Sequence, residues 1–325
     1  MRSFSLLHSG LQRGTLPRGV AAVCAAVTSA ALLASCSSAD PTAEPGASES
    51  AGDSKTIVIG TANFPESEIL GQLWAATLED AGFDVEVKSG IGSREIYMKA
   101  LEEGTVGIVP EYTGNLAQFY KAKLPSGADE QKVYEALEGV LPEALAAGAF
   151  APAESKDAYH VTPEVAKKYK LASLADLKNL DEIKLAGNPE LAERPYGPRG
   201  LSQTYGVDED KFTMHAISDG GGPLTIAALL EGEANVADIY TTSPILDRDG
   251  KEVKLVRLED PQNLVAPQNV VPVYRSADVP QKAVEALDKF DGNLKTEDLV
   301  AMNLRNSGNE KAEPAAIARD FIDAS

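Results

Sequence analysis

Tyrosine residues stand at three places where short apolar runs of the sequence begin or end. Tyr112 closely follows one run, Tyr159 lies at the start of another, and Tyr240 closes a third. A tyrosine ring presents an electron-rich face to a cation, and its hydroxyl can form a hydrogen bond. The three residues therefore indicate a site for a small cationic ligand. Their positions also fit ordinary half-buried tyrosines at strand ends, and position alone does not separate the two interpretations.

Polar residues accompany the same run ends. Asn63 and Ser67 follow the first apolar run, within TANFPES, and Asn115 ends the PEYTGN segment that contains a candidate tyrosine. Asp157 lies two residues before another of these tyrosines. Ligands of open α/β sheets bind at the carboxyl ends of strands. We therefore take these side chains as candidates for the same site.

Other chemistries find less support. The DGGGP segment at 219–223 lacks the Gly-Lys-Ser/Thr of a phosphate-binding loop, so we interpret it as a loop and helix start. Glu66 and Glu111 could form an acid and base pair, but no Gly-x-Ser-x-Gly motif accompanies them. Two cysteines and three histidines provide neither a disulfide framework nor metal-ligand spacing. We expect no enzyme activity, no cofactor and no metal.

The excess of acidic over basic side chains limits the kinds of partner that the protein can bind. The 325 residues include 30 basic and 49 acidic side chains, a formal net charge of −19. Phosphate backbones repel so acidic a surface, which argues against nucleic-acid binding. The length is sufficient for two domains.

The elements that must position these side chains begin at Thr56. Short β-rich runs alternate with amphipathic stretches, a β-α-β-α-β order typical of an open parallel sheet covered by helices. The predicted strands are Thr56–Gly60, Phe83–Lys88 and Val106–Val109, and the predicted helices are Glu66–Ala81 and Ser93–Glu103.

A second series follows a predicted polar helix over Glu130–Ala147. Its strand candidates are Ala158–Val161, Lys184–Ala186, Phe212–Ala216, Val236–Tyr240 and Val253–Leu258; then come Val270–Tyr274 and helical segments at 279–290, 295–304 and 313–324. Two α/β lobes explain the pattern if the chain returns to the first lobe. We predict one lobe from 56–156 with 266–325 and the other from 157–265.

The N-terminal segment predicts an export signal. A basic stretch ends at Arg18, a charge-free run extends from Gly19 to Ala34, and Leu33–Cys36 (LASC) resembles the bacterial lipobox. We expect a signal peptide at 1–35, a lipidated Cys36 and a flexible tether at 36–55, because that segment has no aromatic or branched aliphatic residue. The protein would then be anchored on the outer face of the cell membrane. An ordinary signal peptide with an incidental cysteine is the alternative.

Several segments together resemble the glycine betaine/choline-binding component of ABC importers, the OpuAC-like substrate-binding proteins. These are TIVIGTANFPESEIL, GTVGIVPEYTGN, AYHVTPEVAKKYKLASLADL, NPELAERPYGPRGL and EGEANVADIYTTSP, which cover most of the chain after the tether. PEYTGN is the most specific. The resemblance implies a two-lobed α/β fold of the type II periplasmic-binding-protein class, with the ligand in the interlobe cleft.

The resemblance also implies a box of tyrosine rings around a quaternary ammonium group. Tyr112, Tyr159 and Tyr240 match box positions, Asp157 matches the acid before the second of them, and Arg194 matches the arginine of the ERP element.

The sequence departs from the family pattern at four positions. Asn115 stands where Thr is usual, Ala62 replaces a common Lys, and Ser67 replaces a common Gln. Gln268 occupies the position where many members carry the fourth box tyrosine, so we expect a glutamine amide at the fourth wall. Replacing it with tyrosine would then tighten binding of a simple quaternary amine.

The expected function is that of an extracytoplasmic solute-binding protein that delivers a quaternary amine to an ABC permease and its ATPase. Glycine betaine, choline, carnitine and a histidine-derived betaine remain open as ligands. We expect a monomer held at the membrane by its lipid. A surface enzyme or a ligand sensor on the same scaffold is the alternative.

Overall fold

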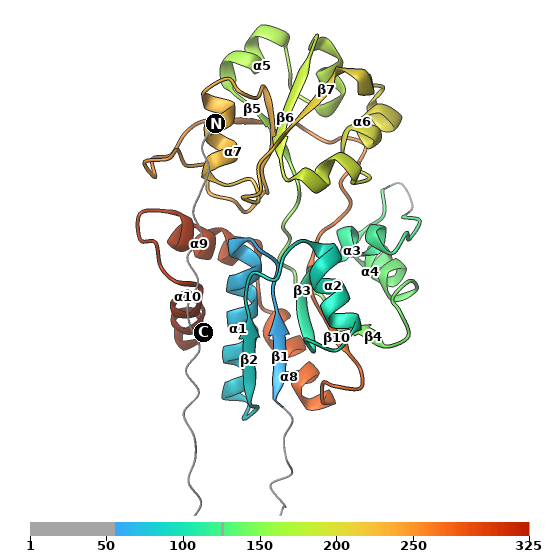
Figure 1. Ribbon diagram of the computed structural model, residues 1–325, viewed down its shortest axis with the longest axis vertical. Coiled ribbons are helices and arrows are strands. Elements are labelled where there is room, and N and C mark those ends of the chain that lie inside the picture. Colours follow the sequence, from blue (N-terminus) through green and yellow to red (C-terminus); the bar gives the residue numbers. More distant parts are fainter. Residues whose placement is uncertain (1–55, 125–126, 325) are drawn as a thin grey trace, which may run out of the picture. The chain divides into compact units, whose positions relative to one another are not determined.

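Two five-stranded mixed sheets organise the chain (Figure 1). The computed structural model describes residues 56–124 and 127–324, and the predicted signal, Cys36 and tether lie outside them. The first sheet has the order β2-β1-β3-β10-β4 and the second β7-β6-β8-β5-β9. Among the described residues, no helix is both long enough and apolar enough to cross a membrane.

The first sheet joins segments from both ends of the described chain. β1 pairs in parallel with β2 and β3, whereas β10 runs antiparallel to β3 and β4. All five residues of β3 are buried, as expected for a central strand covered on both faces. The strands are β1 (Ile57–Gly60), β2 (Val85–Lys88), β3 (Ile108–Tyr112), β4 (Leu145–Ala147) and β10 (Val270–Arg275).

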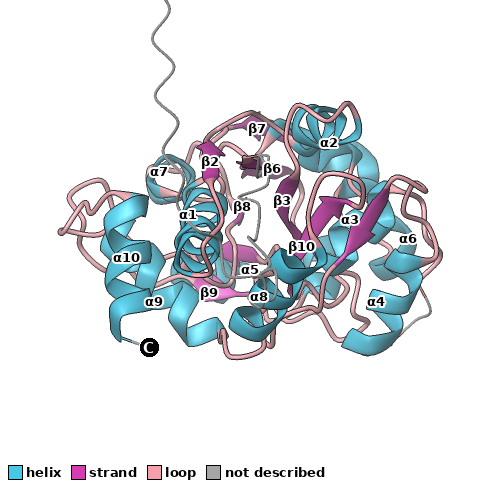
Figure 2. Cartoon of the chain, turned by 90° about the horizontal axis from the view of Figure 1, so that it is seen from below, coloured by secondary structure: helices cyan, strands magenta, loops and turns pink. Residues whose placement is uncertain are grey.

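Helices cover both faces of this sheet (Figure 2). One face packs against α1 (Pro65–Asp80), α8 (Gln281–Asp291), α9 (Thr296–Ser307) and α10 (Pro314–Ala324), and the other against α2 (Arg94–Glu102), α3 (Thr113–Phe119) and α4 (Glu130–Glu138). Proline at the first position of α1 suits a helix start, because its missing N–H would have no partner there. The apolar stripe of α1, including Leu73 and Trp74, is buried in the first core.

The second sheet has its own core. β6 pairs in parallel with β7 and β8, and β5 pairs antiparallel with β8 and β9. Its strands are β5 (Tyr159–Val161), β6 (Ile183–Gly187), β7 (Phe212–Ala216), β8 (Val236–Asp238) and β9 (Val256–Arg257); its helices are α5 (Pro163–Tyr169), α6 (Pro198–Tyr205) and α7 (Pro223–Leu230), with 3-10 helices η1 (Leu174–Asn179), η2 (Pro189–Glu193) and η3 (Glu209–Lys211).

Two antiparallel segments connect the sheets. Glu154 and Asn269 form an isolated β-bridge, and the Ser155 N–H donates to the Gln268 carbonyl at 3.1 Å. The chain therefore enters and leaves the second sheet through two neighbouring, hydrogen-bonded segments.

The element order predicted from the sequence is confirmed, with two corrections. The predicted helix over Glu130–Ala147 ends at Glu138, because Gly139 and Pro142 interrupt it and Leu145–Ala147 joins the first sheet as β4. The strand predicted at Val106–Val109 instead spans Ile108–Tyr112, and a short helix, α3, starts at Thr113.

Candidate functional site

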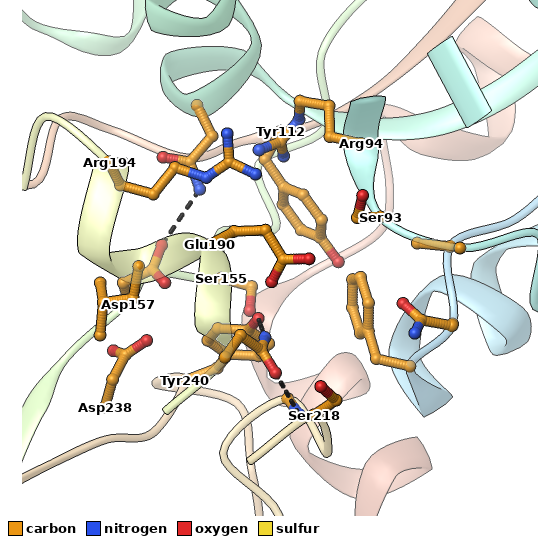
Figure 3. Close-up of a pocket in the computed structure, with 18 of the residues that line it drawn as sticks. Ser93, Arg94, Tyr112, Ser155, Asp157, Glu190, Arg194, Ser218, Asp238 and Tyr240 are labelled. Atoms are coloured by element: carbon orange, nitrogen blue, oxygen red, sulfur yellow. Dashed lines mark hydrogen bonds between the residues drawn. The ribbon is translucent and has the colours of Figure 1, made fainter. Parts of the chain in front are cut away.

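A cavity of about 110 Å³ lies where loops of the two sheets face each other (Figure 3). The first sheet contributes the β1–α1 loop, the start of α2 and the end of β3. The second contributes η2 and the segments after β7 and β8. The lining residues are Ala62, Asn63, Phe64, Gly92, Ser93, Arg94, Tyr97, Tyr112, Asn115, Ser155, Asp157, Asn188, Glu190, Leu191, Arg194, Tyr196, Ser218, Gly220, Asp238 and Tyr240.

Three aromatic rings form one part of the cavity wall. The Phe64 ring lies 6.3 Å from Tyr112, nearly parallel at 30°, and 5.7 Å from Tyr240, edge-on at 68°. The rings come from the β1–α1 loop, the end of β3 and the segment after β8. Two sheets thus contribute rings to one cluster, a geometry suited to a cation with apolar substituents.

Hydrogen bonds fix the two tyrosines of this cluster. The Tyr112 hydroxyl donates to the Glu66 carboxylate at 2.6 Å, and Asn303 donates to the other oxygen of that carboxylate at 2.6 Å. The Asn188 amide donates to the Tyr240 hydroxyl at 3.0 Å. Burial, and then Glu66, raise the pKa of Tyr112, so its hydroxyl stays protonated and remains a donor.

Carboxyl groups form a second part of the wall. Asp157 and Asp238 lie next to each other, and the Asn115 amide donates to Asp157 at 3.0 Å. Burial, and then the charge of Asp157, raise the pKa of Asp238 well above its ordinary value. Asp238 Oδ1 is buried without a hydrogen-bond partner among the described residues. An acidic wall beside aromatic rings attracts a positively charged ligand.

Two arginines reach the cavity, and each already has an acidic partner. Arg94 donates through Nε and Nη2 to the two oxygens of Glu111, at 2.7 and 3.0 Å. Arg194 on the second lobe donates to Glu95 on α2 at 2.9 Å, so this ion pair joins the two lobes across the cavity.

Six of the residues predicted from the sequence line the cavity. They are Asn63, Tyr112, Asn115, Asp157, Arg194 and Tyr240. They derive from segments far apart in the sequence, which meet because the strand ends of both sheets face the same space.

Three other predicted residues do not line the cavity. Tyr159 is 1% exposed, packs in the core of the second lobe and donates its hydroxyl to the Tyr196 carbonyl at 2.7 Å. The Ser67 hydroxyl accepts from the Ala62 N–H at 3.0 Å, which supports the β1–α1 loop from behind. Each side chain therefore acts on the cavity wall from beneath it.

Gln268, expected at a fourth wall, is buried behind Asn115. Its amide oxygen accepts from the Asn115 N–H and its amide nitrogen donates to Asn115 Oδ1, both at 2.8 Å. Gly114 makes this approach possible, because a β-carbon there would stand 2.8 Å from Gln268 Nε2 and 2.5 Å from the Pro267 carbonyl. Gln268 thus orients Asn115, whose side chain in turn reaches Asp157.

Sequence reasoning missed several lining residues. Phe64 stands beside Asn63 in the TANFPES segment, and Tyr196 lies two residues after Arg194. Both lie within two residues of a predicted site residue, and this proximity in the sequence is the signal that could have found them. The interpretation of the DGGGP segment is confirmed, because α7 starts at Pro223. Asp219 accepts from the Leu224 N–H at 2.8 Å and the Thr225 N–H at 3.2 Å, and these are donors that an anion would use.

The described residues contain no group of three or more His, Cys, Asp or Glu side chains arranged to hold a metal ion.

Two lobes with a cleft between them, and a first sheet of the order β2-β1-β3-β10-β4, are those of a type II periplasmic-binding-protein fold. Known structures share it: lactococcal OpuAC in a closed form with glycine betaine has a TM-score of 0.60 at 15% identity, covering 83% of this chain and 96% of its own. Apo YehZ from Escherichia coli has a TM-score of 0.57 at 26% identity, covering 83% and 98%.

The family model OpuAC, described as the substrate binding domain of ABC-type glycine betaine transport system, matches residues 55–324. The chain belongs to this family of solute-binding proteins of ABC transporters. Similar proteins include a glycine-betaine-binding protein of Pseudomonas aeruginosa, 29% identical over 285 residues (82% of this chain, 87% of that protein). The glycine betaine-binding protein YehZ of E. coli K12 is 30% identical over 237 residues (70% and 74%).

Proposed function

We propose that this solute-binding protein captures a small quaternary amine, of the glycine betaine or choline type, for import by an ABC permease and ATPase. The observation that carries the proposal is the ring cluster of Phe64, Tyr112 and Tyr240 beside the acidic pair Asp157 and Asp238. Methylated ammonium groups cannot donate a hydrogen bond through nitrogen, so ring faces and carboxylates are the groups that can attract them. The relatives named for glycine betaine binding support the same class.

Capture would proceed by closure of the lobes about the paired connecting segments, with hinges near residues 156–157 and 265–266. The Arg194–Glu95 ion pair and the Asn115–Asp157 hydrogen bond connect the lobes and support a closed state. Binding and release require no covalent step, and we propose that the ligand leaves unchanged.

The protein would act as a monomer from a lipid anchor at Cys36, on the outer face of the membrane. The LASC sequence and the composition of the following segment support the anchor. Cys36→Ala should leave the precursor unprocessed or release the protein from the membrane fraction. Unchanged fractionation and electrophoretic migration would contradict the anchor.

A thermal-shift screen of the purified protein against quaternary amines, polyamines and amino acids tests the ligand class. A ligand that binds the native state at about 100 times its Kd adds about 2.7 kcal/mol to the free energy of unfolding, which raises the melting temperature. We expect quaternary amines to raise it and neutral amino acids to leave it unchanged. Stabilisation by amino acids alone would refute the proposal.

A further inference from the structure

The two arginines of the cavity bring little net positive charge. The Arg94 guanidinium is held by both oxygens of Glu111, whose side chain is fully buried, and Arg194 is paired with Glu95. Each positive charge is therefore compensated by a carboxylate within hydrogen-bonding distance. No lysine is among the described residues that line the cavity.

Glu190, in contrast, has no compensating partner. It lies in η2 and lines the cavity, and no hydrogen bond or ion pair joins its carboxylate to another described residue. In the view of Figure 3, this carboxylate points into the space between Tyr112 and Tyr240. A free carboxylate at this place faces the same volume as the aromatic rings.

The remaining acids add to the negative charge. Asp238 is 3% exposed and lies next to Asp157. Its Oδ1 has no hydrogen-bond partner among the described residues. Beside Asp238, two further carboxyl groups, those of Asp157 and Glu190, line the same cavity. Behind the ring of Tyr112, Glu66 accepts hydrogen bonds from neutral groups, so its charge is likewise not cancelled by a cation.

We propose that the cavity selects a ligand of net positive charge, a quaternary amine that carries a hydrogen-bond donor such as a hydroxyl, over a zwitterion that carries a carboxylate. Glu190 is the residue that makes the selection. It attracts the ammonium group and repels a ligand carboxylate in the same small cavity, whereas the unpartnered oxygen of Asp238 can accept from a ligand hydroxyl. This inference rests on the proposed function and refines it.

The test compares choline with glycine betaine, since the two share the trimethylammonium group and differ at the other end. Isothermal titration calorimetry would measure both Kd values for the parent protein, Glu190→Gln and the control Glu193→Gln. Glu193 ends the same 3-10 helix and is exposed, so its substitution removes the same charge outside the cavity. Thermal melting without ligand checks that the three proteins fold alike.

We expect the parent to bind choline more tightly than glycine betaine. Glu190→Gln should weaken choline by about tenfold, equivalent to ~1.4 kcal/mol, and leave glycine betaine unchanged or tighter. Glu193→Gln should change neither the Kd of each ligand nor the ratio of the two Kd values. The inference is overturned if the parent prefers glycine betaine, or if Glu190→Gln changes both ligands equally. If neither ligand binds the parent, the proposed function fails together with the inference.

Discussion

The ring of Tyr112 should determine ligand affinity, and its hydroxyl should determine the stability of the fold. The ring lines the cavity next to Phe64, and the hydroxyl donates to the buried Glu66 at 2.6 Å. Tyr112→Ala removes the ring, and a desolvated cation–π contact contributes about 1–2 kcal/mol. We therefore expect affinity for a quaternary amine to fall about 5- to 30-fold.

Tyr112→Phe keeps the ring face and removes only the donor. A buried carboxylate that loses a hydrogen bond costs about 1.5–3 kcal/mol, so the free energy of unfolding should fall by that amount. The affinity should change by less than about threefold, because the ring is retained. Calorimetry would measure the affinity of each variant, and urea denaturation without ligand would measure its stability.

Tyr120→Phe is the matched control for the hydrogen bond. The Tyr120 hydroxyl donates to Glu102, also at 2.6 Å, but on the exposed surface of the first lobe. Water can replace that donor, so we expect at most about 1 kcal/mol of destabilisation and no loss of affinity. If Tyr112→Phe loses as much affinity as Tyr112→Ala, the ring is not the binding group. Unchanged affinity in Tyr112→Ala would remove Tyr112 from the site.

Three further perturbations have definite expected outcomes. Burial raises the pKa of Asp291 above its ordinary value, so the folded protein holds a proton that the unfolded chain has lost. Between the ordinary and the raised pKa, the free energy of unfolding therefore falls by about 1.4 kcal/mol for each pH unit of increase. Asp291→Asn should abolish that decline in urea denaturation measured at a series of pH values above about 4. Equal slopes in the parent and the variant would contradict it. Glu95→Gln breaks the ion pair with Arg194, a partly exposed contact that contributes up to about 1 kcal/mol, so the affinity for the ligand should fall up to about fivefold. Solution scattering should also show a more open ligand-bound form. An unchanged Kd and an unchanged radius of gyration would show that the pair takes no part in closure. Gln268→Tyr breaks two hydrogen bonds to Asn115 at a fully buried position, so it should lower the free energy of unfolding by about 1–3 kcal/mol. It should not tighten the binding of glycine betaine. Tighter binding would show that position 268 faces the ligand.

Local patterns in the sequence were sufficient for the order of the elements. The apolar runs and helical stripes predict most strands and helices to within a few residues, because burial on one face or both imposes the periodicity directly. The exception, the overlong helix at Glu130–Ala147, arose because β4 is a short edge strand whose pairing with β10 depends on residues more than a hundred positions away. The tyrosines at strand ends were also visible, since strand ends can be read locally.

The sequence by itself determined which strand ends stand near the cleft, and the tertiary structure decided which side chains enter it. Tyr159 and Tyr240 both lie near strand ends, yet one ring packs into a core and the other faces the cavity. Gln268 meets a partner 153 residues away, and that contact withdraws it from the cavity. The charge of each cavity arginine likewise depends on its neighbours, because Glu111 and Glu95 approach only when the elements pack. Side-chain direction and charge compensation are long-range properties, and no local pattern encodes them.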